Sequence, residues 1–416
     1  MPGSISRLES LAPFKQKEFR HYISFRFIYI MALRMVATVV GWKLFQLTQS
    51  SFAIGIVGLS EFIPVFSLAL YAGHVIDKSD KRGILLKGVI GYSLCVAAMI
   101  FITTPVIEQK LHKSALEWSF YGIIFFTGLI RAFTGPTTHA IIAQLVPRNQ
   151  LQFAANISSS SWLAASISGH ASAGFFIAWF GVNTTFYIIL AYVLIALCFL
   201  AQVKPKPALV IAYAGGAWES VKEGINYVFK NKVLLGAISL DLFAVLFGGA
   251  QALIPEFADK ILKVGPKGFG WLNAAIDIGS VITIVTLTFF PMRKKQGYKL
   301  FYAVGAFGLC IIIFGLSDIY IISFLALLIA GMMDGISVLV RGTVLQLTTP
   351  DKMRGRVSSV NSMFINSSNE LGQFESGVTA RVFGGAAPAV LFGGIMTMIV
   401  VIITWWKAPT LRKFEY

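Results

Sequence analysis

Ionisable side chains lie deep inside the apolar runs of this sequence, where they could bind a proton or an ionic ligand. They are Arg34, Glu61, Arg131, Asp241, Asp277, Asp334, Arg341, Glu370 and Glu375. A charge at the centre of a bilayer costs at least about 2.5 to 3.5 kcal/mol on insertion scales, so such residues are candidates for function. The alternative is that opposite charges pair and hold helices together. Asp334 and Arg341 are two helical turns apart, and this spacing predicts a direct or water-linked pair.

Two of the carboxylates are the leading candidates for carrying a proton or contacting a substrate charge. Glu61 is near the middle of its apolar run and is followed by Pro64, which frees a backbone carbonyl and can kink a helix. Glu370 lies in a polar run with Asn366, Ser367, Ser368, Asn369, Gln373 and Glu375, and so much polarity cannot face lipid. A carboxylate in a partly dry cavity can bind and release a proton near neutral pH.

The elements that hold these residues follow from the composition. Of 416 residues, 56% are hydrophobic and 13% are charged, whereas soluble domains average about 25% charged residues. Apolar runs recur along the whole chain, and each is long enough to cross a hydrocarbon core of about 30 Å. The runs are continuous rather than alternating, which excludes a barrel and leaves helices. The sequence therefore predicts an all-α polytopic membrane protein.

Twelve transmembrane helices are predicted in two halves of six. Their approximate ranges are 20–46, 52–76, 84–107, 117–146, 152–179, 183–203, 233–257, 269–290, 298–317, 319–347, 357–383 and 386–406. Residues 1–203 and 233–416 form the halves. The hydrophilic stretch 204–232 joins them and is expected to be an amphipathic helix on the inner membrane surface.

A weak internal repeat supports this division into halves. Displaced by 203 positions, Gly128, Arg131 and Pro147 fall on Gly331, Asp334 and Pro350. That self-similarity is typical of a duplicated transporter.

The net charge of +16 is distributed between the spans, in clusters such as Lys78, Lys81 and Arg82. This placement favours positive-inside topology over nucleic-acid binding, with both termini cytoplasmic. Cys95, Cys198 and Cys310 fall inside apolar runs and are expected to pack there. No metal and no cofactor are expected.

Two short motifs resemble those of the major facilitator superfamily. The stretch AGHVIDKSDKR is similar to the family's loop signature at Gly73, Asp77, Lys78, Lys81 and Arg82, and RAFTG is similar to an Arg-x-x-x-Gly motif at Arg131 and Gly135. The blocks GWKLFQLTQSSFAIGIVGLSEFIP, WESVKEGINYVF and TPDKMRGRVSSVNSMFINSSNELGQFESG resemble the bacterial enterobactin exporter-like branch.

The resemblance implies roles for these residues. The loop residues would form a latch that pairs across the interface of the halves when the inner side is shut; positive-inside topology alone also explains the basic residues, but not Asp77. Arg131 would couple protons or fix a buried carboxylate. Gly135, Gly169 and Gly174 would allow close helix packing. The antiporter signature of span five is weakened, because His170 follows Gly169 where drug antiporters carry proline. A packed, hydrogen-bonded role is expected for His170.

The resemblance implies a monomeric secondary transporter of the bacterial cytoplasmic (inner) membrane. The leading hypothesis is proton-driven export of a small amphipathic or siderophore-like molecule by alternating access, with lipid, substrate and protons as partners and no nucleic acid. Lysolipid flipping and facilitated uptake are alternatives within transport. A membrane-embedded enzyme or receptor is disfavoured, because the sequence has no HExxH motif, nucleophile elbow or Walker loop.

Overall fold

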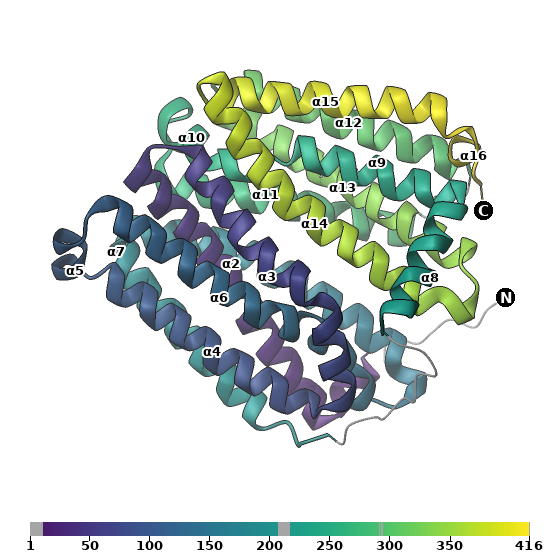
Figure 1. Ribbon diagram of the computed structural model, residues 1–416, viewed down its shortest axis with the longest axis horizontal. Coiled ribbons are helices and arrows are strands. Elements are labelled where there is room, and N and C mark those ends of the chain that lie inside the picture. Colours follow the sequence, from purple (N-terminus) through teal and green to yellow (C-terminus); the bar gives the residue numbers. More distant parts are fainter. Residues whose placement is uncertain (1–10, 207–216, 291, 293, 416) are drawn as a thin grey trace. The chain divides into compact units, whose positions relative to one another are not determined.

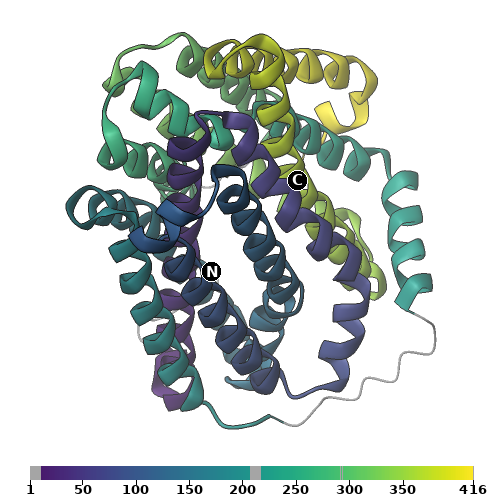
Figure 2. The ribbon, with the colours of Figure 1, turned by 60° about the vertical axis from the view of Figure 1, so that its left-hand side comes forward.

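Every regular element in the described part of the chain is a helix (Figure 1, Figure 2). The computed structural model describes residues 11–206, 217–290, 292 and 294–415, with backbone alone at 70, 77, 217–221, 351 and 352. Ten helices among these residues are long and apolar enough to cross a membrane. Two further crossings come from the second arm of α7 (Leu151–Ala201), a helix that is counted once among the ten, and from the more polar helix α14 (Asp351–Phe383).

Helix α7 (Leu151–Ala201) contains two of the predicted spans (Figure 1). Its 51 residues are broken at Gly181, where φ is 77° and ψ is 172°, a conformation open essentially to glycine alone. The chain reverses there. Ile157, before the break, and Phe199, after it, line the same groove. Helix α7 therefore consists of two arms joined at Gly181, and each arm crosses the membrane once.

Helix α14 (Asp351–Phe383) supplies the remaining crossing. It has 33 residues, which span about 50 Å at 1.5 Å per residue. Its polar run makes it too hydrophilic to count among the ten apolar helices. So many polar side chains cannot face lipid, and they must face other helices or a cavity. With both arms of α7 and with α14, the twelve transmembrane helices predicted from the sequence are confirmed.

The chain divides into two compact units. The first holds Met1–Val40 and Ile63–Ala212, and the second holds Gly41–Phe62 and Tyr213–Tyr416. The first unit contains most of α2 (Lys17–Thr48), the end of α3 (Ser51–Lys78), α4 (Lys81–Ile102), α5 (Pro105–Lys110), α6 (Lys113–Ala140) and α7. The second contains the adjoining ends of α2 and α3, then α8 (Ala217–Lys230), α9 (Lys232–Gly248), α10 (Ile254–Glu256), α11 (Gly265–Phe289), α12 (Gln296–Leu316), α13 (Tyr320–Thr348), α14, α15 (Ala386–Lys407) and α16 (Pro409–Arg412).

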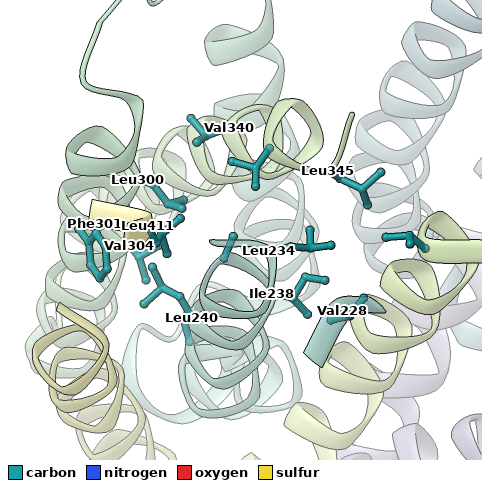
Figure 3. Packing of buried hydrophobic residues seen from close by; sticks show 14 of the residues in the cluster. Val228, Leu234, Ile238, Leu240, Leu300, Phe301, Val304, Val340, Leu345 and Leu411 are labelled. Carbon is teal, nitrogen blue, oxygen red and sulfur yellow. The ribbon is translucent and has the colours of Figure 1, made fainter. Parts of the chain in front are cut away.

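Buried aliphatic side chains fill the core of the second unit (Figure 3). Leu234, Ile238 and Leu240 of α9 share one buried cluster with residues of α12 and α13, and Figure 3 shows Leu240 beside Val304 of α12. Because lipid tails are as apolar as these side chains, the helices are held by van der Waals packing rather than by exclusion of water.

Helix α8 also joins this core. Val228 is buried in the cluster, while Lys222, Glu223 and Lys230 are exposed, so the helix is amphipathic. Gly224 lies against the backbone of α14, where an added Cβ would come within 3.0 Å of the Arg356 carbonyl oxygen. The helix predicted within 204–232 is thus present from Ala217 to Lys230. Its position on the membrane surface stays a prediction.

Helices α11 and α13 are in backbone contact. A Cβ added at Gly331 would lie 2.0 Å from the Ile276 carbonyl oxygen, and one added at Gly279 would lie 2.0 Å from that of Leu328. Small residues at a helix interface allow such close approach in a membrane. The contact brings together the turns of α11 and α13 that carry acidic residues.

Candidate functional site

A buried ion pair joins α9 to α13. Arg341 Nη1 lies 2.6 Å from Asp241 Oδ2, and the two side chains are 7% and 5% exposed. The sequence spacing predicted a direct or water-linked pair between Asp334 and Arg341. The direct ion pair of Arg341 is made with Asp241, a carboxylate from another helix, and Asp334 interacts with Arg341 electrostatically.

A second carboxylate lies beside this pair. Asp334 interacts electrostatically with both Asp241 and Arg341, and it also lies near Asp277 on α11. Arg341 is the one cation with which either Asp241 or Asp334 interacts among the residues that the structure describes. Two carboxylates therefore share one guanidinium. Adding one proton or another monovalent cation would neutralise the three charges of Asp241, Asp334 and Arg341.

A small cavity separates these groups. Its volume is about 10 Å³, and Asp241, Asp334 and Ser337 line it together with apolar residues of α9, α12 and α13. That volume is close to what one water molecule needs. The Ser337 hydroxyl is buried and faces Asp241, but it is outside hydrogen-bonding geometry with any described group. The arrangement can hold one small polar species between the two carboxylates.

Glu61 and Glu370 are on helices that touch. A Cβ added at Gly58 of α3 would lie 2.8 Å from the Glu370 carbonyl oxygen, so α3 and α14 are in backbone contact there. Glu61 is one turn further along α3 and half-buried; Glu370 is buried, and its Oε2 accepts a long hydrogen bond of 3.4 Å from Gln373. Both glutamates make further contacts. The Glu370 side chain is therefore withdrawn from the molecular surface, and the Glu61 side chain is withdrawn in part.

The turn between α2 and α3 is hydrogen-bonded to α10 and to the π-helical turn Phe257–Ile261 that follows it, within the second unit. Ser51 Oγ donates a hydrogen bond of 2.6 Å to Glu256 Oε2, and Lys260 Nζ donates to the Gln49 carbonyl oxygen at 3.3 Å. This connection was not predictable from the sequence, because Ser51 and Glu256 stand far apart in the chain and no local pattern pairs them.

In the first unit, Arg34 of α2 stacks on Trp162 of α7. Its guanidinium carbon lies 5.0 Å from the indole centroid, within cation–π range. Gly169 makes this approach possible, since an added Cβ would lie 2.7 Å from Arg34 Cβ and 2.6 Å from the Met31 carbonyl oxygen. His170 is buried and shares a hydrogen bond of 2.8 Å with Thr38, which confirms its packed role.

The other predicted packing glycines differ from Gly169. Gly174 is buried in α7. At Gly135 of α6 an added Cβ would meet nothing within 4 Å, so the close packing predicted there is not present. Its Cα faces open space rather than a neighbouring helix. Arg131, one turn earlier, is half-buried and makes further contacts.

The loop motif is only partly described. The side chain of Asp77 lies outside the described residues, Lys78 is exposed, Lys81 is buried and Gly73 has open space around it. The proposed latch therefore stays a prediction.

Asp80, which is not among the residues predicted from the loop motif, organises this loop. Its carboxylate caps α4 by accepting from the amides of Arg82 and Gly83 at 3.1 and 3.0 Å, and it accepts a further bond from the Lys206 amide at 3.1 Å. Arg82 Nη2 donates to the Ala201 carbonyl oxygen at 2.8 Å. Aspartate directly before a helix is a signal that could have identified this cap.

Comparisons with known proteins agree with this architecture. Residues 8–415 match the family described as "Transmembrane secretion effector". The chain is 22% identical over 378 residues to the MFS-type transporter YfiS of Bacillus subtilis (strain 168), covering 86% of this chain and 85% of that one. It is 23% identical over 392 residues to the enterobactin exporter EntS of Escherichia coli O1:K1 / APEC, covering 92% and 86%.

Solved transporters share the fold. The nucleoside transporter NupG superposes with a TM-score of 0.77 at 14% identity, over 94% of this chain and 99% of that one. A D-xylose-proton symporter gives a TM-score of 0.74 at 12% identity, over 97% and 100%. These relatives and structural neighbours are transporters rather than enzymes. The chain is a multi-pass membrane transporter that belongs to the transmembrane secretion effector family of the major facilitator superfamily.

Proposed function

We propose that this protein is a proton-coupled exporter of a small amphipathic molecule, working as a monomer by alternating access in the bacterial cytoplasmic membrane. The observation that carries the proposal is the group formed by Asp241, Asp334 and Arg341, in which two buried carboxylates share one guanidinium around a cavity of about 10 Å³. Such a group is one positive charge short of neutrality, and a proton is the smallest cation that can supply it.

Protonation would change which helices the arginine connects. A proton bound to a carboxylate oxygen of Asp241 removes the charge that holds Arg341 to α9. Arg341 then pairs with Asp334, which lies two turns away on its own helix. Loss of the proton restores the pair between α9 and α13. Binding and release of one proton thus makes and breaks a connection between two transmembrane helices, which is the two-state element that coupling requires.

We assign further roles to other residues that were predicted from the sequence. Glu61 and Glu370, withdrawn from solvent along the α3–α14 contact, would bind a second proton or a substrate charge. Arg131 would hold a buried carboxylate in place. The loop residues Gly73, Asp77, Lys78, Lys81 and Arg82 would act as the latch, with both termini cytoplasmic and residues 1–203 and 233–416 moving as halves joined by 204–232.

The proposed direction of transport rests on the similarity of this chain to EntS. EntS is named as an enterobactin exporter, and this relative covers nearly the whole chain. Export of an amphipathic or siderophore-like molecule is therefore the direction we assign. Lysolipid flipping and facilitated uptake are outcomes that the experiment can reveal.

The test is transport by the purified full chain in proteoliposomes with and without an imposed pH gradient. Siderophores, aromatic drugs and lysolipids are screened as substrates, and Asp241→Asn is compared with Asp318→Asn, which alters an exposed loop carboxylate. We expect gradient-driven accumulation in the wild type and in Asp318→Asn, and its loss in Asp241→Asn. Driven transport that persists in Asp241→Asn would remove this group from the coupling mechanism, and transport independent of the gradient would indicate facilitated diffusion.

A further inference from the structure

An open groove of about 520 Å³ runs along the surface of the first unit, between the start of α2 and both arms of α7. Its wall is largely aliphatic and aromatic, and it includes three hydroxyl groups, from Ser24 of α2 and from Ser160 and Ser161 of α7. The volume falls in the range of about 300 to 1,000 Å³ that is usual for small-molecule sites. An apolar wall with a few hydroxyl groups fits a ligand that is mostly hydrocarbon.

Positive charges stand at the end of this groove where α2 begins. Arg20 lies one turn before Ser24 and two turns before Phe27, so it shares the face of α2 that lines the groove. Its Nη1 donates a hydrogen bond of 2.9 Å to the carbonyl oxygen of Phe14, which itself lines the groove. Lys17, one turn before Arg20, adds a second exposed cation. The Arg20 charge is thus joined to the groove both by a direct contact and by its helix face.

The acidic residue of this stretch does not neutralise these cations. Glu18 is the one acid between positions 11 and 28 of the sequence, and its carboxylate is paired with the Lys206 ammonium. Glu18 also lies on the opposite face of α2, because two residues correspond to about 200° of helical rotation. A guanidinium has several N–H donors in a fixed fork, so the bond to Phe14 leaves others for the oxygens of a phosphate. This end of the groove therefore suits an anionic headgroup.

The groove has the depth of one membrane leaflet. From Arg20 to Ile28, its last lining residue on α2, the helix rises about 12 Å at 1.5 Å per residue. Half of a hydrocarbon core of about 30 Å is about 15 Å. Along this distance the groove passes from exposed cations to the hydroxyl of Ser24 and then to apolar side chains. The same order of charge, polar ester groups and hydrocarbon is found in a phospholipid.

The hydroxyl of Ser161 is at the level of Ser24. Gly169 of α7 packs against Met31 of α2, and the earlier residues of both helices line one groove, so the two helices run in the same direction. Ser161 lies eight residues before Gly169, and Ser24 lies seven residues before Met31. The Ser161 Oγ atom is buried and has no hydrogen-bond partner among the residues that the structure describes. An ester carbonyl oxygen of a lipid would accept its proton.

We propose that this groove binds one anionic phospholipid of the adjacent leaflet. Its phosphate would contact Arg20 and Lys17, its ester groups would meet the serine hydroxyls, and one acyl chain would lie along the apolar wall. A lipid with an additional cationic group is disfavoured beside these two cations. The inference goes beyond the proposed function, because this lipid is a bound ligand rather than the molecule transported. In the topology proposed above, the site faces the cytoplasmic leaflet, where anionic lipids are abundant.

The test is native mass spectrometry of the detergent-purified full chain with dioleoylphosphatidylglycerol and dioleoylphosphatidylcholine, which share their acyl chains. We expect one phosphatidylglycerol to bind at least about tenfold more tightly than phosphatidylcholine. Glycerol 3-phosphate has the headgroup chemistry without acyl chains, and it should not displace the lipid. Equal affinities for the two lipids, or displacement by glycerol 3-phosphate, would overturn the proposal.

Two double variants separate the site from general surface charge. Lys17→Gln with Arg20→Gln removes two cations from the end of the groove, and Lys110→Gln with Lys113→Gln removes two exposed cations beyond the far end of α4. We expect the first variant to bind both lipids within about twofold of each other, and the second to keep the wild-type preference. Ser160→Phe, at an exposed position of the groove wall, fills the groove without changing charge and should weaken both lipids. Unchanged preference in the first variant, or unchanged affinity in Ser160→Phe, contradicts the site.

The same spectra report the number of chains in each particle. A dimer that disappears in Ser160→Phe would show that a second copy covers the groove, and it would overturn the assignment to a lipid. If the loss of the Arg20 bond to Phe14 destabilises the first double variant, Ser160→Phe still tests the groove, because its charges and that bond are intact.

Discussion

Arg341 reaches across to Asp241 on another helix, at 2.6 Å, rather than along its own helix to Asp334. The reason is geometric, because α9 packs against α13 at this level and brings a carboxylate closer than two helical turns can. The pair is almost completely buried, and each member therefore depends on the other for its counter-charge.

Removing one member of that pair should destabilise the protein. Arg341→Ala leaves Asp241 and Asp334 without their cation, and loss of one partner of a buried pair costs about 3 to 5 kcal/mol. A double variant, Asp241→Asn with Arg341→Gln, leaves no unpaired charge at this pair and should recover part of the loss. Thermal unfolding in detergent measures both. Equal melting temperatures for wild type and Arg341→Ala would contradict the role of the pair in stability.

Glu61→Gln tests whether a second proton site exists on α3. The amide mimics the protonated carboxyl group permanently, so uphill transport driven by a pH gradient should be lost if Glu61 carries a coupled proton. Exchange of substrate down its own gradient should survive, because the cavity keeps its shape. Driven transport and exchange are measured on one proteoliposome preparation. Driven transport at the wild-type rate excludes Glu61 as a carrier and leaves Asp241 or Glu370.

Gly169→Ala should loosen the packing of α2 on α7. The added methyl would meet the Met31 carbonyl oxygen at 2.6 Å, so the helices must separate and Arg34 must move off Trp162. We expect a lower melting temperature, because the packing of α2 on α7 is lost. Gly135→Ala is the matched control, since its methyl enters open space and alanine favours a helix by about 1 kcal/mol over glycine. A control that is as damaging as Gly169→Ala would show that the effect is not steric.

Asp80→Ala should weaken the start of α4. The side chain satisfies two helix amides, and loss of such a cap costs typically about 1 kcal/mol. Asp80→Asn keeps an oxygen that can accept these bonds and should be milder. Hydrogen exchange of the Arg82 and Gly83 amides reports the change directly, because both are protected by Asp80 in the folded protein. Unaltered exchange in Asp80→Ala would contradict the cap.

Local signals and long-range contacts explain what the sequence could and could not predict. The helices and their number follow from apolar runs, because each run has to satisfy its own backbone in lipid. The cap formed by Asp80 could also have been predicted, since a helix cap depends on residues only two and three positions away. The pairing of Asp241 with Arg341 could not be predicted, because helical spacing tells which residues share a face of one helix but not which other helix packs against that face. Trp162 escaped notice for the same reason, as its place under Arg34 depends on packing of α2 on α7.

The break at Gly181 has a consequence for how the protein enters its membrane. The fifth and sixth crossings are joined at Gly181 without an intervening loop. We therefore expect them to enter the bilayer together, as a helical hairpin, during synthesis. A protease site or epitope tag placed after Gly181 would lengthen this turn and separate the two insertions. Translation-arrest mapping would then show two pulling events in place of one, which ties a single glycine to the biogenesis of the whole first unit.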